Sequence, residues 1–379
     1  MAKLKKLVLP FIFSLFLMSC NSQPQNITIK ETPMNWHLTN IPTETGSISF
    51  DYRLNQYFLV DNLMGFMLGN NSGAEVHNSV IEDRPYYKKN YQTTLFKTED
   101  GGLSFKKITV GKGTLSKMTK DTQGNLYVIK EVYEKDNTPP QYTILKSTDV
   151  GETWQEIGGF NTQKIFNVRF YDANKGIVSI EKGKGVELLK TIDGGKTWET
   201  LIVKVKGVDI NDPFFINENE LYTTYEAEDT NATATVNFNT GKTIVHQCNL
   251  PKGYRFDVFF NDDVTGNLYS EVLKYGELHP LMLYNHTTQK LITYDFKNNR
   301  DQTNVGVNIS GNYIAVLRSD NGKIFYYYSK DNGKNWIKES LPDYLADSHP
   351  IALYGKGLVW VKSIRNLYNL QVRKPSFQN

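Results

Sequence analysis

Cysteine is nearly absent from this chain of 379 residues, which contains only Cys20 and Cys248. If Cys20 is modified, as argued below, Cys248 has no partner, so no intrachain disulfide can support the fold. We expect Cys248 to be a small buried apolar residue. Long apolar runs are also scarce: the one from Leu7 to Met18 has twelve residues, which is too short for a helix that spans a bilayer.

The sequence also lacks the common signatures of metal and phosphate sites. Its six histidines are scattered, and it contains no His-x-x-x-His or Cys-x-x-Cys pair. No glycine-rich phosphate loop joins a predicted strand to a helix. We therefore predict no metal site, no cofactor and no catalytic residue. The net charge of +3 falls to 0 when Lys3, Lys5 and Lys6 are removed, so nucleic acid is not expected as a partner.

Those three lysines begin a segment with the features of a bacterial signal peptide. The apolar run that follows them ends in Leu17-Met18-Ser19-Cys20, which resembles the bacterial lipobox. The resemblance implies cleavage before Cys20 and attachment of acyl chains such as palmitate to that residue. An ordinary signal peptide with an incidental cysteine is the alternative. Two or more acyl chains anchor a protein stably to a membrane.

The expected organisation has three parts. Residues 1–19 form the signal peptide, 20–33 form the lipidated cysteine and a flexible tether, and 34–379 form a single folded domain. No acidic run follows Cys20. We therefore expect an envelope protein anchored to a membrane and facing the periplasm.

A short motif is repeated along the domain. Four segments share the pattern Ser/Thr-x-Asp-x-Gly-x-Thr/Ser/Asn followed by an aromatic residue, and a fifth is degenerate. In such a turn the Asp carboxylate accepts backbone N–H groups and the Gly adopts a conformation that other residues disfavour. We therefore assign a structural role to the repeated residues, which are Asp100, Phe105, Asp149, Gly151, Trp154, Asp193, Gly195, Trp198, Asp331, Gly333 and Trp336, with Asn239 and Gly241 in the degenerate copy.

These segments closely resemble the Asp-box, or BNR repeat, of β-propellers. Successive Asp residues are 49, 44 and 138 positions apart, and 138 is three times 46. A second recurring turn, such as Asp121-Thr-Gln-Gly124, precedes most copies. A module of about 46 residues with four strands is a propeller blade.

The predicted fold is all-β: a seven-bladed β-propeller of four-stranded antiparallel blades with Asp-box hairpins. The last module lacks a fourth strand, and the segment at Trp36 looks like an isolated strand. We therefore expect this N-terminal strand to close the last blade, which leaves no exposed edge.

The mature chain resembles secreted propellers related to the photosystem II stability and assembly factor, and more distantly the sialidase and sortilin propellers. The first resemblance implies a docking surface for a protein or peptide partner in the cell envelope, as an assembly factor or a toxin-neutralising protein. The alternative is a glycan-binding protein or a sialidase-like glycoside hydrolase. A sialidase requires three converging arginines, and the spacing of Arg53, Arg169 and Arg255 predicts that these do not converge. We therefore favour a protein without enzymatic activity.

Two loops are the candidate ligand sites. The first runs from Asn70 to Gln92 and is unusually long, and the second follows the strand that ends near Tyr133. Tyr and Arg residues are frequent anchors of interfaces, and long loops on a rigid scaffold often carry function. The alternative is that both are merely solvated loops. The candidate ligand-binding residues are Arg84, Tyr86, Tyr87, Tyr91 and Tyr133.

Overall fold

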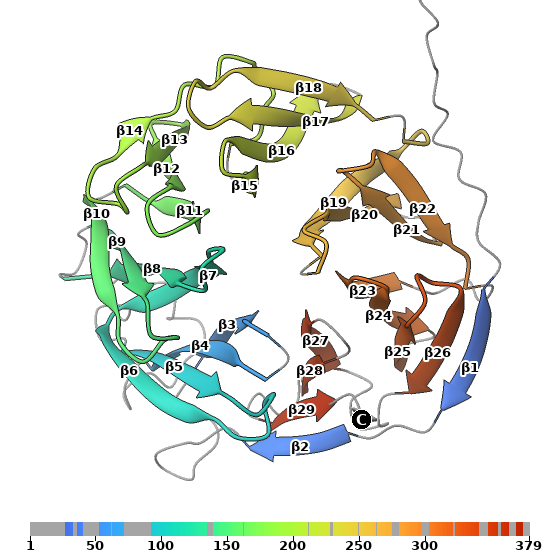
Figure 1. Cartoon of the computed structure of the whole chain (residues 1–379). Coiled ribbons are helices and arrows are strands. Elements are labelled where there is room, and N and C mark those ends of the chain that lie inside the picture. Colours follow the sequence, from blue (N-terminus) through green and yellow to red (C-terminus); the bar gives the residue numbers. More distant parts are fainter. Residues whose placement is uncertain are drawn as a thin grey trace, which may run out of the picture.

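The structure is a computed structural model of the chain. It describes residues 27–32, 36–40, 53–61, 63–71, 92–134, 139–161, 163–210, 212–227, 230–248, 250–262, 264–274, 280–296, 303–320, 323–340, 348–354, 358–363 and 369–373. These residues form β-sheets arranged in a ring (Figure 1), so the predicted all-β propeller is confirmed. The described part of the chain has no helix with the length and apolar character needed to cross a bilayer.

The first three blades are each built from four consecutive strands. Their strands are β3 (Arg53–Leu59), β4 (Gly65–Asn71), β5 (Gln92–Thr98) and β6 (Lys106–Lys112); β7 (Thr114–Lys120), β8 (Leu126–Val132), β9 (Gln141–Ser147) and β10 (Gln155–Asn161); and β11 (Ile165–Phe170), β12 (Gly176–Lys182), β13 (Gly185–Thr191) and β14 (Glu199–Thr200).

The next three blades also use consecutive strands. Their strands are β15 (Phe214–Asn217), β16 (Glu220–Ala227), β17 (Thr230–Asn237) and β18 (Thr243–Gln247); β19 (Tyr254–Asn261), β20 (Leu268–Lys274), β21 (Leu281–Asn285) and β22 (Lys290–Tyr294); and β23 (Thr303–Ser310), β24 (Tyr313–Asp320), β25 (Lys323–Ser329) and β26 (Asn335–Ser340).

The predicted seven-bladed count is wrong. The described residues form six blades from consecutive strands, not seven, and the ring is closed by a composite sheet from both ends of the chain. That sheet joins β27 (Ser348–Tyr354), β28 (Leu358–Ser363) and β29 (Asn369–Arg373) to the N-terminal strand β2 (Trp36–Asn40). β2 pairs antiparallel with β29 and so closes the ring.

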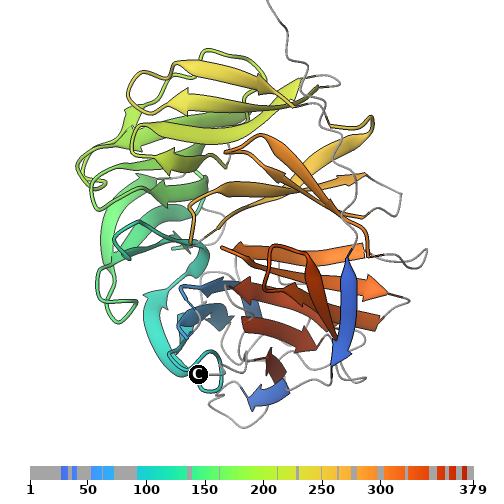
Figure 2. The same ribbon diagram turned by 45° about the vertical axis from the view of Figure 1, so that its right-hand side comes forward.

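The blades are also not uniform, because a second N-terminal strand extends one of them. β1 (Thr28–Thr32) pairs in parallel with β26 and makes the β23–β26 blade five-stranded. Figure 2 shows β1 (blue) beside the orange-red strands of this blade. Ile29 packs against the apolar cluster of the blade, and Lys338 Nζ lies 2.8 Å from Glu31 Oε1. These residues fall within the predicted tether, so the tether is shorter than expected. The segment pairs with β26 because the open edge of that strand offers unpaired backbone groups.

The repeated motif forms the same hydrogen-bonded turn in each of the four complete copies. In the copy at Asp193, Thr191 Oγ1 donates to Asp193 Oδ1 (2.8 Å) and accepts from Gly195 N (2.9 Å), while Thr197 N donates to Asp193 Oδ1 (2.9 Å). The same three bonds recur around Asp100, Asp149 and Asp331. The spacing of the motif therefore reflects one local geometry.

The degenerate copy is built differently from the prediction. Asn237, not Asn239, accepts the turn N–H groups: its Oδ1 binds Asn239 N (3.1 Å) and Thr240 N (2.9 Å). Asn239 instead donates from Nδ2 to Asn219 Oδ1 (3.2 Å). An amide side chain two residues before the expected position can form an Asx-type turn. The pattern of the complete copies does not predict this substitution.

The tryptophans of the motif join each blade to the one before it. Trp336, which is 1% exposed, lies against Tyr294 and Phe296 of the preceding blade, at ring-centroid distances of 5.4 and 4.8 Å. Trp198 similarly meets Phe160 of the preceding blade, and it also meets Phe170 of its own blade. Each Trp Nε1 also donates to the carbonyl of the motif glycine, as at Gly333 (2.8 Å). The aromatic residue thus satisfies its own polar group while it packs between blades.

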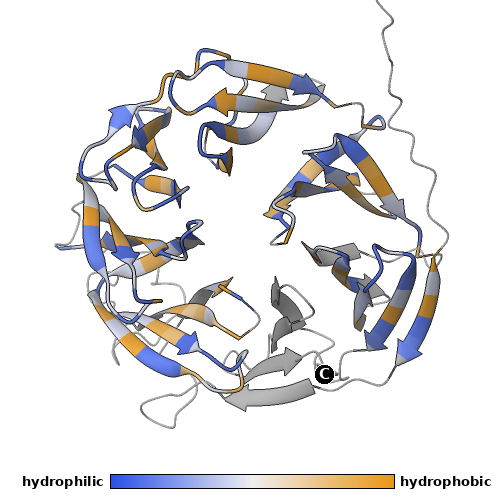
Figure 3. Cartoon of the chain, in the orientation of Figure 1, coloured by the Kyte–Doolittle hydropathy of each residue, from blue (hydrophilic) through white to orange (hydrophobic). Residues whose placement is uncertain are grey.

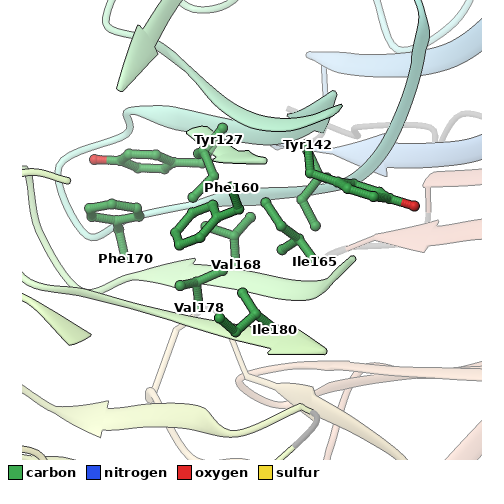
Figure 4. Close-up of a cluster of buried hydrophobic side chains, with 10 residues drawn as sticks. Tyr127, Tyr142, Phe160, Ile165, Val168, Phe170, Val178 and Ile180 are labelled. Atoms are coloured by element: carbon green, nitrogen blue, oxygen red, sulfur yellow. The ribbon is translucent and has the colours of Figure 1, made fainter. Parts of the chain in front are cut away.

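The core lies between the faces of neighbouring blades. Figure 4 shows one such cluster, in which Tyr127 stacks on Phe170 at a centroid distance of 4.0 Å and Ile165, Val168 and Val178 fill the space beside them. The apolar segments (orange) lie mostly within the strands in Figure 3. The first strand of each blade is the innermost strand of the ring (Figure 1), and we call the axis of the ring the channel.

Candidate functional site

The two ends of the channel differ in what they carry. Within a blade the first and third strands run the same way, so the turns after them lie at one end of the ring; we call this end the turn face. Hydrogen bonds between the two turns of a blade agree with this arrangement. Gly101 N donates to Leu63 O (2.7 Å) in the first blade, and Gly194 N donates to Asn174 O (2.9 Å) in the third. The loops between second and third strands lie at the opposite end, the loop face.

A pocket of about 750 Å³ opens at the turn-face end of the channel. Most of its lining comes from the last residues of the inner strands and the turns that follow them. The lining residues are Phe58, Leu59, Lys117, Met118, Thr119, Lys120, Asp121, Thr122, Asn167, Arg169, Phe170, Tyr171, Phe214, Phe215, Ile216, Asn261, Asp262 and Gly266. Five neighbouring blades therefore contribute to one concave surface of mixed apolar and polar character.

Arg169 is the centre of the polar lining. Its Nη2 donates to Asp212 Oδ1 (2.7 Å) and its Nε to the same oxygen (3.2 Å), and the buried Asn167 donates to it from Nδ2 (2.5 Å). The guanidinium lies over the ring of Phe214, 3.8 Å from its centroid. The Arg169 side chain keeps 24% exposure and that of Asp212 keeps 44%. The guanidinium is thus held in one orientation and still reaches the pocket, which favours planar recognition of a ligand.

Two aspartates, one in the turn after β7 and one in the turn after β19, complete the polar edge of the pocket. Asp121 is buried and accepts from Gln123 N, Asn125 N and Tyr127 Oη. Burial alone would raise the pKa of Asp262, but bonds from Thr265 and from the backbone N–H groups of Gly311, Val264 and Thr265 outweigh it and hold that pKa below its usual value. Both carboxylates therefore cap their turns.

Tyr133, one of the residues predicted to bind ligand, does not line this pocket. Tyr133 follows the end of β8, at the loop face, and its hydroxyl donates to Glu131 Oε1 (2.5 Å). Burial and the Glu131 carboxylate raise the pKa of Tyr133 above its usual value, so the phenol stays neutral. Arg84, Tyr86, Tyr87 and Tyr91 lie outside the described residues.

The three arginines considered for a sialidase centre are not at one end of the channel. Arg53 and Arg255 are the first and second residues of β3 and β19, whereas Arg169 is the fifth residue of β11. Arg169 lines the pocket, and Arg255 does not. Among the described residues, no group of three or more His, Cys, Asp and Glu is arranged to hold a metal ion.

A second polar cluster lies inside the protein, between the β15–β18 and β19–β22 blades. His286 Nε2 is 2.8 Å from Ser270 Oγ, and its Nδ1 is 2.7 Å from the hydroxyl of Tyr222, which donates to Thr233 (2.6 Å). His286 is 5% exposed, and burial lowers its pKa to about 3. The Ser–His contact is therefore a satisfied network in the core, closed to substrate.

Cys248 is part of the same core. It is buried, as predicted, and its Sγ lies 3.2 Å from the hydroxyl of Tyr284.

Sequence reasoning missed the pocket because its residues carry no local signal. Asn167 and Arg169 lie on β11, Phe214 lies on β15 of the next blade, and Asp212 lies in the connection between those blades. Arg169 was noted only as a possible sialidase arginine. The proximity of Arg169, Asp212 and Phe214 depends on how neighbouring blades pack.

No protein-family model and no curated protein matches this sequence. The fold is similar to that of solved propellers. The structure of YCF48 bound to D1 peptide matches with a TM-score of 0.55 and 13% identity, over 92% of this chain and 99% of that chain. The acylaminoacyl peptidase of Pyrococcus horikoshii gives a TM-score of 0.54 and 9% identity, over 83% of this chain and 51% of that chain.

The β-propeller domain of the Trilobed protease from Pyrococcus furiosus, which has an open velcro topology, gives a TM-score of 0.52 and 9% identity, over 87% of this chain and 99% of that chain. At these identities the similarity extends to the fold alone: the chain is a β-propeller similar in structure to YCF48.

Proposed function

We propose that this protein is a lipid-anchored envelope protein that binds a polypeptide segment of a partner in the turn-face pocket. The observation that carries the proposal is the orientation of Arg169, held by Asp212 and Phe214 at the edge of a pocket of about 750 Å³. The anchor is Cys20, and the repeated turns are Asp-boxes that make the scaffold rigid. The similar fold of YCF48, whose structure contains a D1 peptide, supports a peptide ligand.

The chemistry of the lining favours a peptide over a sugar. Aromatic and aliphatic side chains such as Phe58 and Ile216 alternate around the pocket with polar groups, which suits the mixed character of an extended peptide. A sialidase centre would need three arginines on one side of the substrate, and Arg53 and Arg255 begin their strands at the other end of the channel. The arrangement therefore supports binding of a peptide and argues against hydrolysis of a glycan.

Site-specific photocrosslinking in the native bacterium tests this proposal. A benzophenone amino acid replaces Ile216, which lines the pocket and is 41% exposed. The matched control replaces Ile244 on the outer strand β18, which is 52% exposed. We expect position 216 to crosslink one defined protein segment, identified by mass spectrometry, and position 244 not to crosslink it.

A synthetic peptide with the sequence of that segment then gives the affinity by fluorescence anisotropy. Arg169→Ala should weaken binding by about thirtyfold, because truncation of an interface anchor costs about 2 kcal/mol. Arg169→Lys keeps the charge but loses the planar group and should also weaken binding. Identical crosslinks at both positions, or an affinity unchanged by Arg169→Ala, would exclude the pocket as the binding site.

A further inference from the structure

Exposed large apolar side chains gather at one end of the described ring. Seven are more than 40% exposed among the described residues. Five of these lie at the turn face, in four different blades, and we call them the aliphatic tips: Leu63, Leu103, Ile192 and Val264 in turns, and Ile216 near the end of β15. The other two, Ile202 and Ile244, lie just after β14 and on β18, at the outer rim.

A single exposed aliphatic residue is ordinary in a soluble protein, but five at one end of the ring point to a contact surface. Val264 is 64% exposed and Ile192 is 63% exposed, although both sit in turns, where polar residues are usual. Both turns are held firmly by capping: Asp262 Oδ1 accepts from Val264 N (3.0 Å), and Asp193 caps the turn after Ile192. The tips therefore project from rigid turns at one end of the ring.

The N-terminal strand places the anchor at this same end. β1 runs parallel to β26, and its first residue, Thr28, is the register partner of Asn335. Asn335 belongs to the motif turn, because its N and Nδ2 both donate to Asp331. The chain that precedes Thr28, and with it Cys20, therefore joins the propeller at the turn face.

The distance from Cys20 to the propeller is short. Seven residue steps separate Cys20 from Ile27, and a fully extended chain of that length spans at most about 25 Å. To bring the loop face to the membrane, the tether would first have to run back along the blade beside β26, whose six residues span about 20 Å. The tether alone therefore favours the turn face as the side that meets the bilayer.

From these observations we propose that the turn face docks on the membrane surface, with the aliphatic tips in contact with the lipid. This inference rests on the lipid anchor of the proposed function, but it does not depend on any partner. It gives the propeller a fixed orientation: the pocket is reached from the membrane side, and the loop face, with Tyr133, points away from the membrane. A segment bound in the pocket would then come from a protein that emerges from the same membrane.

Fluorescence quenching by spin-labelled lipids tests the orientation. The full chain is expressed in bacteria, purified after processing and reconstituted into vesicles of phosphatidylethanolamine and phosphatidylglycerol. Cys248 is replaced by Ala, and one new cysteine carries an environment-sensitive fluorophore: Val264→Cys at the turn face, or Lys184→Cys in the exposed β12–β13 connection at the loop face. We expect the label at 264 to be quenched and shifted to the blue, and the label at 184 to be unaffected.

A variant with Leu63→Ser and Ile192→Ser tests whether the tips themselves make the contact. Its label at 264 should lose most of its quenching, whereas Ile244→Ser, on the outer rim, should leave the quenching unchanged. An anchored protein whose two labels are quenched equally, or not at all, overturns the docked orientation but leaves peptide binding intact. A protein that leaves the vesicles altogether overturns the anchor and the orientation together.

Discussion

Gly333 offers a direct test of how the motif turns are built into the core. Its φ of 80° lies in the left-handed region, and an added Cβ would lie 2.1 Å from Cε1 and 2.7 Å from Cζ of Tyr294. Tyr294 is 2% exposed and is held against Trp336, so its ring has no free space to enter. Gly333→Ala therefore introduces both backbone strain and a clash between two blades.

The two contributions can be separated with a matched control. Left-handed backbone costs a non-glycine residue about 1–2 kcal/mol, and overpacking of a core costs about 1–3 kcal/mol, so Gly333→Ala should lower the free energy of unfolding by about 2–5 kcal/mol. Gly124 has a φ of 87° with no atom within 4 Å of the added Cβ. Gly124→Ala should therefore show the backbone cost alone.

Urea unfolding followed by circular dichroism measures both variants against the unmodified chain. Both substitutions reduce the entropy of the unfolded chain equally, so the difference between them reports the clash. We expect Gly333→Ala to be less stable than Gly124→Ala by about 1–3 kcal/mol. Equal losses in the two variants would refute the packing argument.

Two further predictions concern the dependence of stability on pH. His286 has a pKa of about 3 in the folded protein, whereas the ordinary value is 6.5. As the pH drops, the unfolded chain therefore binds a proton before the folded protein does. The free energy of unfolding should fall between about pH 6.5 and pH 3, by up to about 1.4 kcal/mol per pH unit. His286→Asn should flatten this part of the urea-midpoint profile, and an unchanged slope would contradict the assignment. Asp149 and Asp193 have pKa values lowered to about 2 from 3.8, mainly by the hydroxyls of Thr153 and Thr197; their contribution should be present above pH 3.8 and lost between about 3.8 and 2. The double Asp→Asn variant should lack this acid transition, and the same transition in both proteins would rule out the motif as its source.

The predicted and the proposed ligand sites lie at opposite ends of the ring. The loop at 70–92 is a predicted site because of its length and its tyrosines, and its flanking residues Asn71 and Gln92 pair at the loop-face end of the first blade. The pocket lies at the other end, among short turns. Photocrosslinking from Ile216 can therefore be compared with the same probe at Tyr133, which separates the two faces in one experiment.

Local sequence was enough to predict the repeating turns. Ser147, Asp149 and Gly151 are spaced so that one carboxylate and one hydroxyl bind the N–H groups of a single turn, and such bonds involve neighbours in the chain only. The period of the motif then gave the propeller fold. Sequence reasoning failed at the degenerate copy, where Asn237 takes over from Asn239, because a different local turn satisfies the same backbone.

What the sequence by itself determined is thus the all-β propeller, its capped turns and the closing role of the strand at Trp36, because these follow from hydrogen bonds and packing that recur with a fixed period. The tertiary structure alone decided the pairing of β1 with β26 and the meeting of Arg169, Asp212 and Phe214. The first depends on the open edge that β26 presents in the folded blade, and the second depends on the angle and distance between whole blades. No residue spacing encodes that geometry, since each blade is positioned by the sum of its contacts with both neighbours.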